Sequence, residues 1–510
     1  MKNGFPPYPV VDTSAGKLQG TIHRGPADTC AISAFLGIPY AAPPVGELRW
    51  QPPQALAPWS GIRPASRFSP DCWQEPRVES HARSLSEDCL YLNIWTPADA
   101  PPRSLPVMVW FHGGSFESGS GAEPSCDGAA LASLGAVVVT LNSRLGIFGF
   151  LAHPSLTGES AEGSSGNYGL LDQLAALAWV RDNIAGFGGD RTRVTVFGVS
   201  AGAAAISLFL TTPLADGLFQ QAILQSPGTA RALSSLDEAE SAGLSLSADL
   251  NALRKRSARD VLAMTPLLVP EVRGLTSPRP LRPIRDGRVV REDERTALKG
   301  YGPRPMPIIL GCNTDEGTRL TQDWPVRSLK QYREFLRANF PGREEAFGAL
   351  YPAKTDDEVA SRVAELFADT QFNYGVRLLA RTMSARERRT WRYLFTRRRP
   401  GQGDGPHHTD EVPYVFGSLD VASQRGGNAY DATDRALSAL MMNAWVAFAA
   451  SGDCAGAWPP YTTQSERHLE IGDSIAPSHG WRGRMLDAIE DYYSIRDDRP
   501  QARASIPKRP

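Results

Sequence analysis

The sequence predicts an α/β protein built around a mostly parallel central sheet. Short, continuously apolar runs recur along its 510 residues and alternate with stretches that have helical spacing. Continuous apolar runs are typical of strands that helices cover on both faces. Because strands that alternate with helices usually pair in parallel, the two observations together indicate a parallel sheet flanked by helices.

The predicted elements follow one another along the whole chain. The clearest helices are expected at residues 170–184, where leucines recur at helical spacing, and at 436–450. No internal repeat or linker is visible, so we expect one domain over residues 1–510, with a loose polar tail at 497–510. The six main strands are predicted at residues 107–112, 136–142, 194–199, 221–225, 307–311 and 391–396.

Charge and cysteine content exclude several classes of protein. The 54 basic and 55 acidic residues give a net charge of −1, which argues against a nucleic-acid partner. The six cysteines form no CxxC pair and have no metal-ligand spacing with histidine, so no metal site is expected.

Membrane insertion and export are not expected either. The most apolar stretch, around residues 136–142, is too short to span a bilayer and reads as a buried strand. Residues 1–7 carry one positive charge but no apolar segment of the kind found in signal peptides. The expected location is therefore cytoplasmic, without a membrane partner.

The pentapeptide Gly-Val-Ser-Ala-Gly at 198–202 has the GxSxG form of a nucleophile elbow. It follows the predicted strand at 194–199 and precedes a helix-like stretch at 201–210, which is the strand–turn–helix context that this motif requires. Ser200 is therefore the candidate nucleophile. A similar start at Ser160 lacks both the final glycine and the preceding strand.

A serine nucleophile needs a general base and an acid that orients the base. In hydrolases with this elbow the acid and then the histidine follow the serine, each after a later strand. Asp315 and Glu316 follow the strand predicted at 307–311, and His407 and His408 follow the one at 391–396. From the residues alone, either carboxylate and either histidine could serve.

An oxyanion hole needs backbone amides that converge on the reacting oxygen. The strand at 107–112 ends in the loop His-Gly-Gly-Ser at 112–115, the glycine-rich type that supplies such amides in lipases and esterases. The amide of Ala201, directly after the nucleophile, is the other expected donor.

With these motifs in place, the chain resembles the type B carboxylesterase/lipase family, which includes bacterial para-nitrobenzyl esterases and the cholinesterases. The resemblance extends from about residue 11 to about residue 481 and implies an α/β-hydrolase fold. It rests on several ordered blocks beyond GxSxG: FLGIPYA at 35–41, SEDCLYLNI at 86–94, NYGLLDQ at 167–173, FGGD at 187–190, GD at 452–453 and WP at 458–459.

The resemblance selects among the candidate catalytic residues. It implies Ser200 as nucleophile and Glu316, within an Asp-Glu-Gly triplet, as the acid. It implies His408 as the base, because this residue lies three positions before Glu411 as the family's histidine does. The implied oxyanion donors are Gly114, Ser115 and Ala201.

Two further pairs follow from the resemblance alone. Arg49 and Glu87 match an ion pair of the family that has a structural role. Cys72 and Cys89 match its first disulfide, although two reduced thiols are the equal alternative in a protein without an export signal.

Two departures from the family pattern bear on activity. Val199 stands where the family elbow usually has glutamate, which suggests an altered pH profile or substrate preference. No tryptophan lies within residues 79–86, where cholinesterases hold their cationic substrate, so a cholinesterase is disfavoured.

We therefore expect a serine carboxylic ester hydrolase that acts on small to medium aryl or alkyl esters, with neither metal nor organic cofactor. The alternative is a carbamate or amide hydrolase, or an acyltransferase, with the same triad. A non-catalytic binding member of the family is a minor alternative. Both monomers and homodimers occur in such a family, and the sequence does not choose between them.

Overall fold

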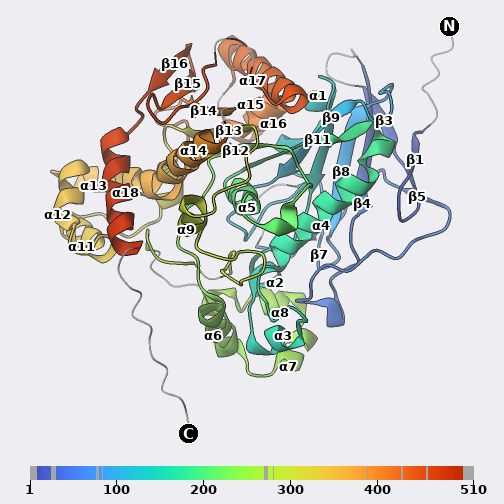
Figure 1. Ribbon diagram of the computed structural model, residues 1–510, viewed down its shortest axis with the longest axis horizontal. Helices are drawn as coiled ribbons and strands as arrows, with labels where there is room; N and C mark the ends of the chain where they lie inside the picture. Colours follow the sequence, from blue (N-terminus) through green and yellow to red (C-terminus); the bar gives the residue numbers. More distant parts are fainter. Residues whose placement is uncertain are drawn as a thin grey trace.

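An eleven-stranded sheet runs through the computed structural model of the protein (Figure 1). The structure describes residues 8–24, 30–75, 80–82, 84–268, 274–279, 281–387, 389–426, 429–454, 456 and 458–497. The strand order is β16-β15-β14-β13-β12-β11-β9-β10-β8-β4-β3. The predicted loose tail lies, after residue 497, outside the described residues.

Seven neighbouring strands in the middle of the sheet are parallel, and antiparallel strands extend both edges. The parallel strands are β9 (Leu105–Phe111), β10 (Val137–Leu141), β11 (Gly189–Val199), β12 (Gln221–Gln225), β13 (Ile308–Asn313), β14 (Thr390–Phe395) and β15 (Arg467–Ile471). The antiparallel strands are β3 (Thr21–Arg24), β4 (Ala31–Pro39), β8 (Tyr91–Pro97) and β16 (Ile475–His479).

The predicted fold class is confirmed, and all six predicted strands are present as β9 to β14. The reason is visible in β9, where alternate side chains enter different cores. Val107 and Val109 pack into one apolar cluster, whereas Met108 and Trp110 pack into the other. A strand that is buried on both faces must be apolar at every position, which is the pattern the sequence shows.

Helices cover both faces of the sheet (Figure 1). On one face lie α4 (Tyr168–Asn183), α5 (Ala201–Phe209) and α14 (Tyr374–Arg386), whose buried residues belong to the first cluster. On the other lie α1 (Ala129–Ala132), α15 (Val412–Phe416) and α17 (Ala432–Ser451). The helices α4 and α17 confirm the two helices predicted from apolar spacing.

Two long insertions separate the later strands. The first, between β12 and β13, contains α6 (Leu236–Leu246), α7 (Leu250–Lys255), α8 (Ala258–Leu262) and α9 (Glu294–Lys299). The second, between β13 and β14, contains α10 (Thr318–Thr321), α11 (Leu329–Asn339), α12 (Glu344–Leu350), α13 (Asp356–Ala368), the π-helical turn η7 (Asp369–Asn373) and α14. Residues from both insertions reach the cavity described below.

The remaining elements surround this frame. They are β1 (Val10–Asp12), β2 (Lys17–Gln19) and β5 (Ile62–Pro64) in a small sheet, the pair β6 (Asp71–Cys72) and β7 (Leu85–Ser86), and the helices α2 (Gly146–Phe150), α3 (Pro154–Glu159), α16 (Leu419–Gly426) and α18 (Gly483–Asp497). None of the helices in the described part of the chain combines the length and apolarity needed to cross a bilayer.

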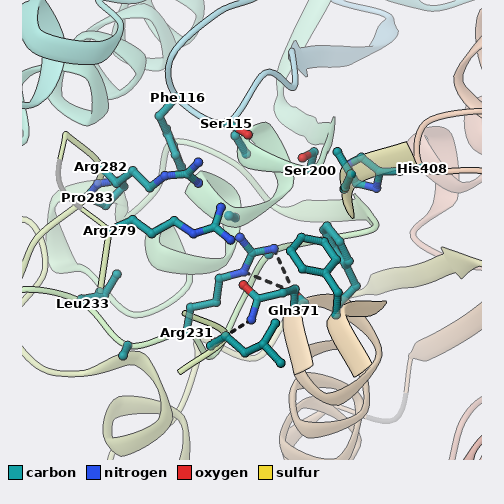
Figure 2. A pocket seen from close by; sticks show the side chains of 18 of the residues that line it. Ser115, Phe116, Ser200, Arg231, Leu233, Arg279, Arg282, Pro283, Gln371 and His408 are labelled. Atoms are coloured by element: carbon teal, nitrogen blue, oxygen red, sulfur yellow. Dashed lines mark hydrogen bonds between the residues drawn. The ribbon is translucent and has the colours of Figure 1, made fainter. Parts of the chain in front are cut away.

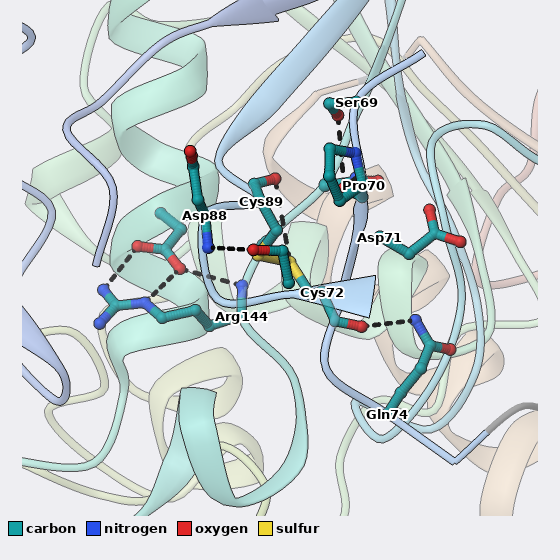
Figure 3. Close-up of a disulfide and its surroundings, with 12 residues drawn as sticks. Ser69, Pro70, Asp71, Cys72, Gln74, Asp88, Cys89 and Arg144 are labelled. Atoms are coloured by element: carbon teal, nitrogen blue, oxygen red, sulfur yellow. Dashed lines mark hydrogen bonds and ion pairs between the residues drawn. A yellow bond between two sulfur atoms is a disulfide. The ribbon is translucent and has the colours of Figure 1, made fainter. Parts of the chain in front are cut away.

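Two cross-links fasten the segment that precedes β8. A disulfide joins Cys72 and Cys89, whose Cα atoms are 5.0 Å apart (Figure 3). Arg49 forms a two-pronged ion pair with Glu87, with N–O distances of 2.7 and 2.5 Å. A further nitrogen of Arg49 donates to backbone oxygens of residues 253, 254 and 256. This pair therefore ties the N-terminal region to α7, as expected of a structural pair.

We expect the Cys72–Cys89 bond to stabilise the fold without taking part in catalysis. The two cysteines are 17 residues apart in the sequence. A cross-link that closes a loop of this length lowers the entropy of the unfolded chain and stabilises the folded protein by about 3 kcal/mol. The Cys72→Ala/Cys89→Ala variant should unfold at lower urea concentration than the oxidised protein, while ester turnover at 25 °C stays near normal. Coincident urea curves for the two proteins would contradict this stabilising role.

Candidate active site

Ser200 lies at the sharp turn between β11 and α5, where a strained backbone holds it. Its backbone angles are φ 55° and ψ −118°, an uncommon conformation for a residue with a side chain. Its amide donates to the Gln225 carbonyl at 2.9 Å, which fixes the turn against β12. A side chain at Gly202 would place its Cβ only 2.0 Å from the Phe111 carbonyl, so glycine is needed for α5 to approach β9.

His408 and Glu316 form a hydrogen-bonded pair next to this turn. Glu316 follows β13 and His408 follows β14, the neighbouring strand, so both loops emerge at the same edge of the sheet. The His408 Nδ1 and the Glu316 Oε2 are 2.5 Å apart. His408 and Ser200 both line one cavity, and Figure 2 shows the two side chains pointing toward each other. The structure thus brings together the three residues that the sequence analysis selected.

The carboxylate of Glu316 is buried and has further hydrogen-bond donors. Its Oε1 accepts from the Ser226 hydroxyl at 2.5 Å and from the Asn313 amide at 2.6 Å. These two donors occupy one oxygen and leave Oε2 for His408, so the acid can orient the imidazole in one rotational state.

The rejected candidates, Asp315 and His407, lie in a separate group beside this site. The His407 Nε2 is 3.0 Å from an oxygen of Asp404 and 3.7 Å from an oxygen of Asp315. The hydrogen bond with Asp410 is the main reason why the pKa of His407 is raised. Potential ligand atoms of Asp315, Asp404 and His407 lie within 4.8 Å of one another.

The predicted oxyanion donors come from two turns beside Ser200. Gly114 and Ser115 have positive φ angles of 109° and 62°, and the Gly114 carbonyl accepts hydrogen bonds from two amides of the same turn. A side chain at Gly114 would clash with the Ser118 carbonyl at 2.0 Å, so only glycine permits this turn. Ala201 is the first residue of α5, where a helical amide has no acceptor within its own helix. All three residues line the same cavity as Ser200.

The cavity in front of Ser200 has a volume of about 290 Å³. Part of its wall is apolar, with Leu320, Trp324, Phe367 and Phe372 from the second insertion. The other part is basic and carries Arg231, Arg279 and Arg282 from the first insertion and the loop before it (Figure 2).

A second buried carboxylate, Glu411, lies close to Glu316. It accepts hydrogen bonds from Gln225 Nε2 at 3.0 Å and from Asn313 Nδ2 at 2.7 Å. The backbone N–H of Asn313 donates to Glu316, so Asn313 contacts both carboxylates. Burial, followed by the charge of Glu316, raises the pKa of Glu411 to about 7. Glu411 thus retains its proton in the folded protein under conditions where an exposed glutamate has lost it.

This raised pKa predicts a loss of stability as the pH rises. Between about pH 4.5 and 7 the folded protein holds one more proton at Glu411 than the unfolded chain does, so raising the pH favours unfolding. Replacement by glutamine removes the titration. The stability of wild type relative to Glu411→Gln should therefore decline from pH 5 to pH 8, measured as the difference in urea midpoints. A constant difference across this range would show that Glu411 titrates normally.

The comparison with protein families decides how this arrangement is classified. The family model described as the carboxylesterase family matches residues 7–482. The chain belongs to the carboxylesterase family. Its eleven-stranded sheet is accordingly an α/β-hydrolase sheet, and the protein is an enzyme that hydrolyses esters, as the sequence predicted.

Three characterised carboxylesterases illustrate the relationship. The chain is 46% identical to fumonisin B1 esterase of Sphingopyxis macrogoltabida over 93% of its own length and 88% of the relative. It is 34% identical to para-nitrobenzyl esterase of Bacillus subtilis, covering 92% of this chain and 96% of the relative. It is 33% identical to carboxylesterase 1C of Rattus norvegicus, covering 94% and 92%.

Several residues of the site were not foreseen from the sequence. Ser226 and Asn313 support Glu316, and Phe372 packs against His408 with ring centroids 4.6 Å apart. The three cavity arginines were missed as well, since the pocket walls were expected from residues 234–276 and 323–374 and the arginines lie just outside the first of these segments. Only Ser226 and Asn313 carried a usable signal, since each lies next to the end of a predicted strand.

Proposed function

We propose that this carboxylesterase works by a Ser200–His408–Glu316 acyl-enzyme mechanism. His408 takes the proton of Ser200 as the serine oxygen attacks the ester carbonyl. Glu316 holds the imidazole and stabilises its charged form. The alcohol leaves with the proton from His408, and a water molecule then releases the acid by the same steps in reverse.

The amides of Gly114, Ser115 and Ala201 are proposed to stabilise the tetrahedral intermediate. One such donor contributes about 3 kcal/mol to the transition state in well-studied serine hydrolases. The turn at Gly114 and the start of α5 hold these amides in place before the substrate arrives, so no free energy is spent on orienting them during the reaction.

The observation that carries the proposal is the buried pair of His408 and Glu316 beside the strained Ser200 turn. Val199, where the family usually has glutamate, is buried and places no charge in the elbow. We therefore propose that Glu411, whose pKa burial raises to about 7, is the nearby carboxylate whose titration modifies the pH profile of the reaction.

The test combines covalent labelling with ester hydrolysis. The intact mass should increase by one adduct after treatment with a fluorophosphonate, and para-nitrophenyl esters from acetate to octanoate should be hydrolysed. Fumonisin B1 and para-nitrobenzyl esters are candidate substrates because two relatives are named for them. Absence of both labelling and turnover would overturn the proposal.

The same acyl-enzyme could pass its acyl group to another acceptor or could form from a carbamate or an amide. Product analysis with water alone and with an added alcohol or amine separates these possibilities. Release of the free acid at equal rates in both mixtures supports hydrolysis. Labelling without ester turnover would favour the carbamate, amide or transfer reaction.

A further inference from the structure

The basic part of the cavity wall is formed by three arginines that lie close to the reaction centre. Arg231 follows β12, and Arg279 and Arg282 belong to the insertion before α9. Figure 2 shows their guanidinium groups gathered on one side of the cavity, while Ser200 and His408 lie on the other. Arg282 is 9% exposed, so at least this cation is largely removed from bulk solvent.

Arg231 is held in position by its surroundings. Its Nε and Nη2 donate to the Gln371 carbonyl at 3.2 and 3.0 Å, and its guanidinium carbon lies 5.0 Å from the centre of the Phe372 ring. Burial, followed by the charge of Arg282, lowers the pKa of Arg231 to about 9. A guanidinium that is both buried and repelled by a neighbouring one gains stability when an anion binds between them.

Two carboxylates also lie near this group. Glu117 is 3.6 Å from Arg282 in an ion pair. Glu294 lies at the cavity wall near Arg231, and it accepts hydrogen bonds from Ser207, Thr229 and the amide of Ala230. Burial raises the pKa of Glu294, which reduces its tendency to be charged. Three guanidinium groups thus line this side of the cavity, and Arg231, buried and repelled by Arg282, favours the binding of an anion.

The arginines lie on the side of the site that receives the acyl group. The leaving alcohol must be near His408, because His408 protonates its oxygen. The Phe372 ring contacts both groups, with its centre 4.6 Å from that of His408 and 5.0 Å from the Arg231 guanidinium. Because Figure 2 shows Arg231 and His408 on opposite sides of the cavity, a group bound by Arg231 lies away from the alcohol and belongs to the acyl part.

We infer that the cavity is built for esters whose acyl part carries a free carboxylate, which Arg231, Arg279 and Arg282 bind. This inference rests on Ser200 as the nucleophile and adds a substrate class to the proposed function. Guanidinium groups bind carboxylates through paired N–H donors, which fixes the orientation of the acyl chain as well as its charge. Hydrolysis of such an ester gives an alcohol and a dicarboxylate.

The first test compares two esters that differ in one group. 4-Nitrophenyl hydrogen adipate and 4-nitrophenyl hexanoate have acyl chains of equal length, and the first ends in a carboxylate. After subtraction of the uncatalysed rate, kcat/KM should favour the adipate by roughly 10- to 100-fold, the range expected for hydrogen bonds to a charged group. Added salt should reduce this preference. A preference for the hexanoate would overturn the inference while leaving ester hydrolysis established.

Variants locate the source of the preference. Arg282→Gln and Arg231→Gln should each lower the ratio of kcat/KM for the adipate to kcat/KM for the hexanoate by about tenfold or more. Arg231→Lys should restore part of the loss because it restores the charge. Arg333→Gln, on an exposed position of α11, is the matched control and should leave the ratio unchanged. Equal losses for both esters in the cavity variants would mean that the arginines serve folding alone.

A binding measurement makes the inference independent of turnover. Ser200→Ala cannot react, so calorimetry on this variant can compare free adipate with hexanoate. Tighter binding of adipate, weakened by Arg282→Gln, supports the inference even if the chemistry of the proposed function fails. Equal binding of the two acids would refute the arginine site, whatever the outcome of the hydrolysis assays.

Discussion

Ser200→Ala is expected to lower kcat by roughly 10⁴- to 10⁶-fold, the loss seen when the nucleophile of a serine hydrolase is removed. The variant should also give no fluorophosphonate adduct. The fold should survive, because the hydrogen bond of residue 200 to Gln225 uses the backbone amide and alanine retains it. Thermal unfolding of both proteins checks this last point.

Ser160→Ala is the matched control for this experiment. Ser160 lies in the Gly-Glu-Ser-Ala sequence that resembles the start of the elbow motif, but it follows the short helix α3 and is absent from the cavity wall. Its replacement should leave both the adduct and the turnover intact. Substantial turnover by Ser200→Ala, or loss of the adduct in Ser160→Ala, would contradict the assignment of the nucleophile.

His408→Gln should lower kcat to a similar extent, because glutamine cannot accept the serine proton at neutral pH. The neighbouring His407→Gln variant provides the matched control. His407 pairs with Asp404 and Asp410 outside the triad, so its loss should change kcat/KM by less than about tenfold. Steady-state kinetics on one para-nitrophenyl ester measures both variants.

The combined variant tests whether Ser200 and His408 act as one unit. Residues of a triad have strongly non-additive effects, so Ser200→Ala/His408→Gln should be no slower than the slower single variant. Multiplied losses would mean that the two residues contribute to turnover separately. A large loss in His407→Gln with normal turnover in His408→Gln would reverse the choice of base.

The parallel centre of the fold was predictable because a strand that is buried on both faces has a continuous apolar run in its own sequence. Each of the strands β9 to β14 contains a short, mostly apolar run, and this run can be recognised without knowing which strands are neighbours. The antiparallel edge strands have a weaker signal in the sequence. In β4, the pairing with β8 shifts in register between Phe35 and Ile38, and such an irregularity depends on the partner strand.

The position of Ser200 and of the candidate oxyanion donors was predictable for a related reason. Ser200, Gly114 and Ala201 lie in short motifs where local backbone geometry determines the function. The hydrogen bonds of the two buried carboxylates depend instead on contacts between distant parts of the chain. Ser226 is 90 residues from Glu316, and Asn313 is 98 residues from Glu411. The cavity arginines depend in addition on the path of the insertion between β12 and β13, which has no sequence periodicity that would place its side chains.

The π-helical turn η7 makes the shape of the acyl site depend on chain length. This turn lies in one continuous helical path from α13 to α14, and it presents the Gln371 carbonyl to Arg231 and the Phe372 ring to His408. A π turn holds one more residue than an α turn, and removing that residue would rotate every later position by about 100°. Gain or loss of a single residue here could therefore change which acids an enzyme of this family releases, while every member of the triad stays in place.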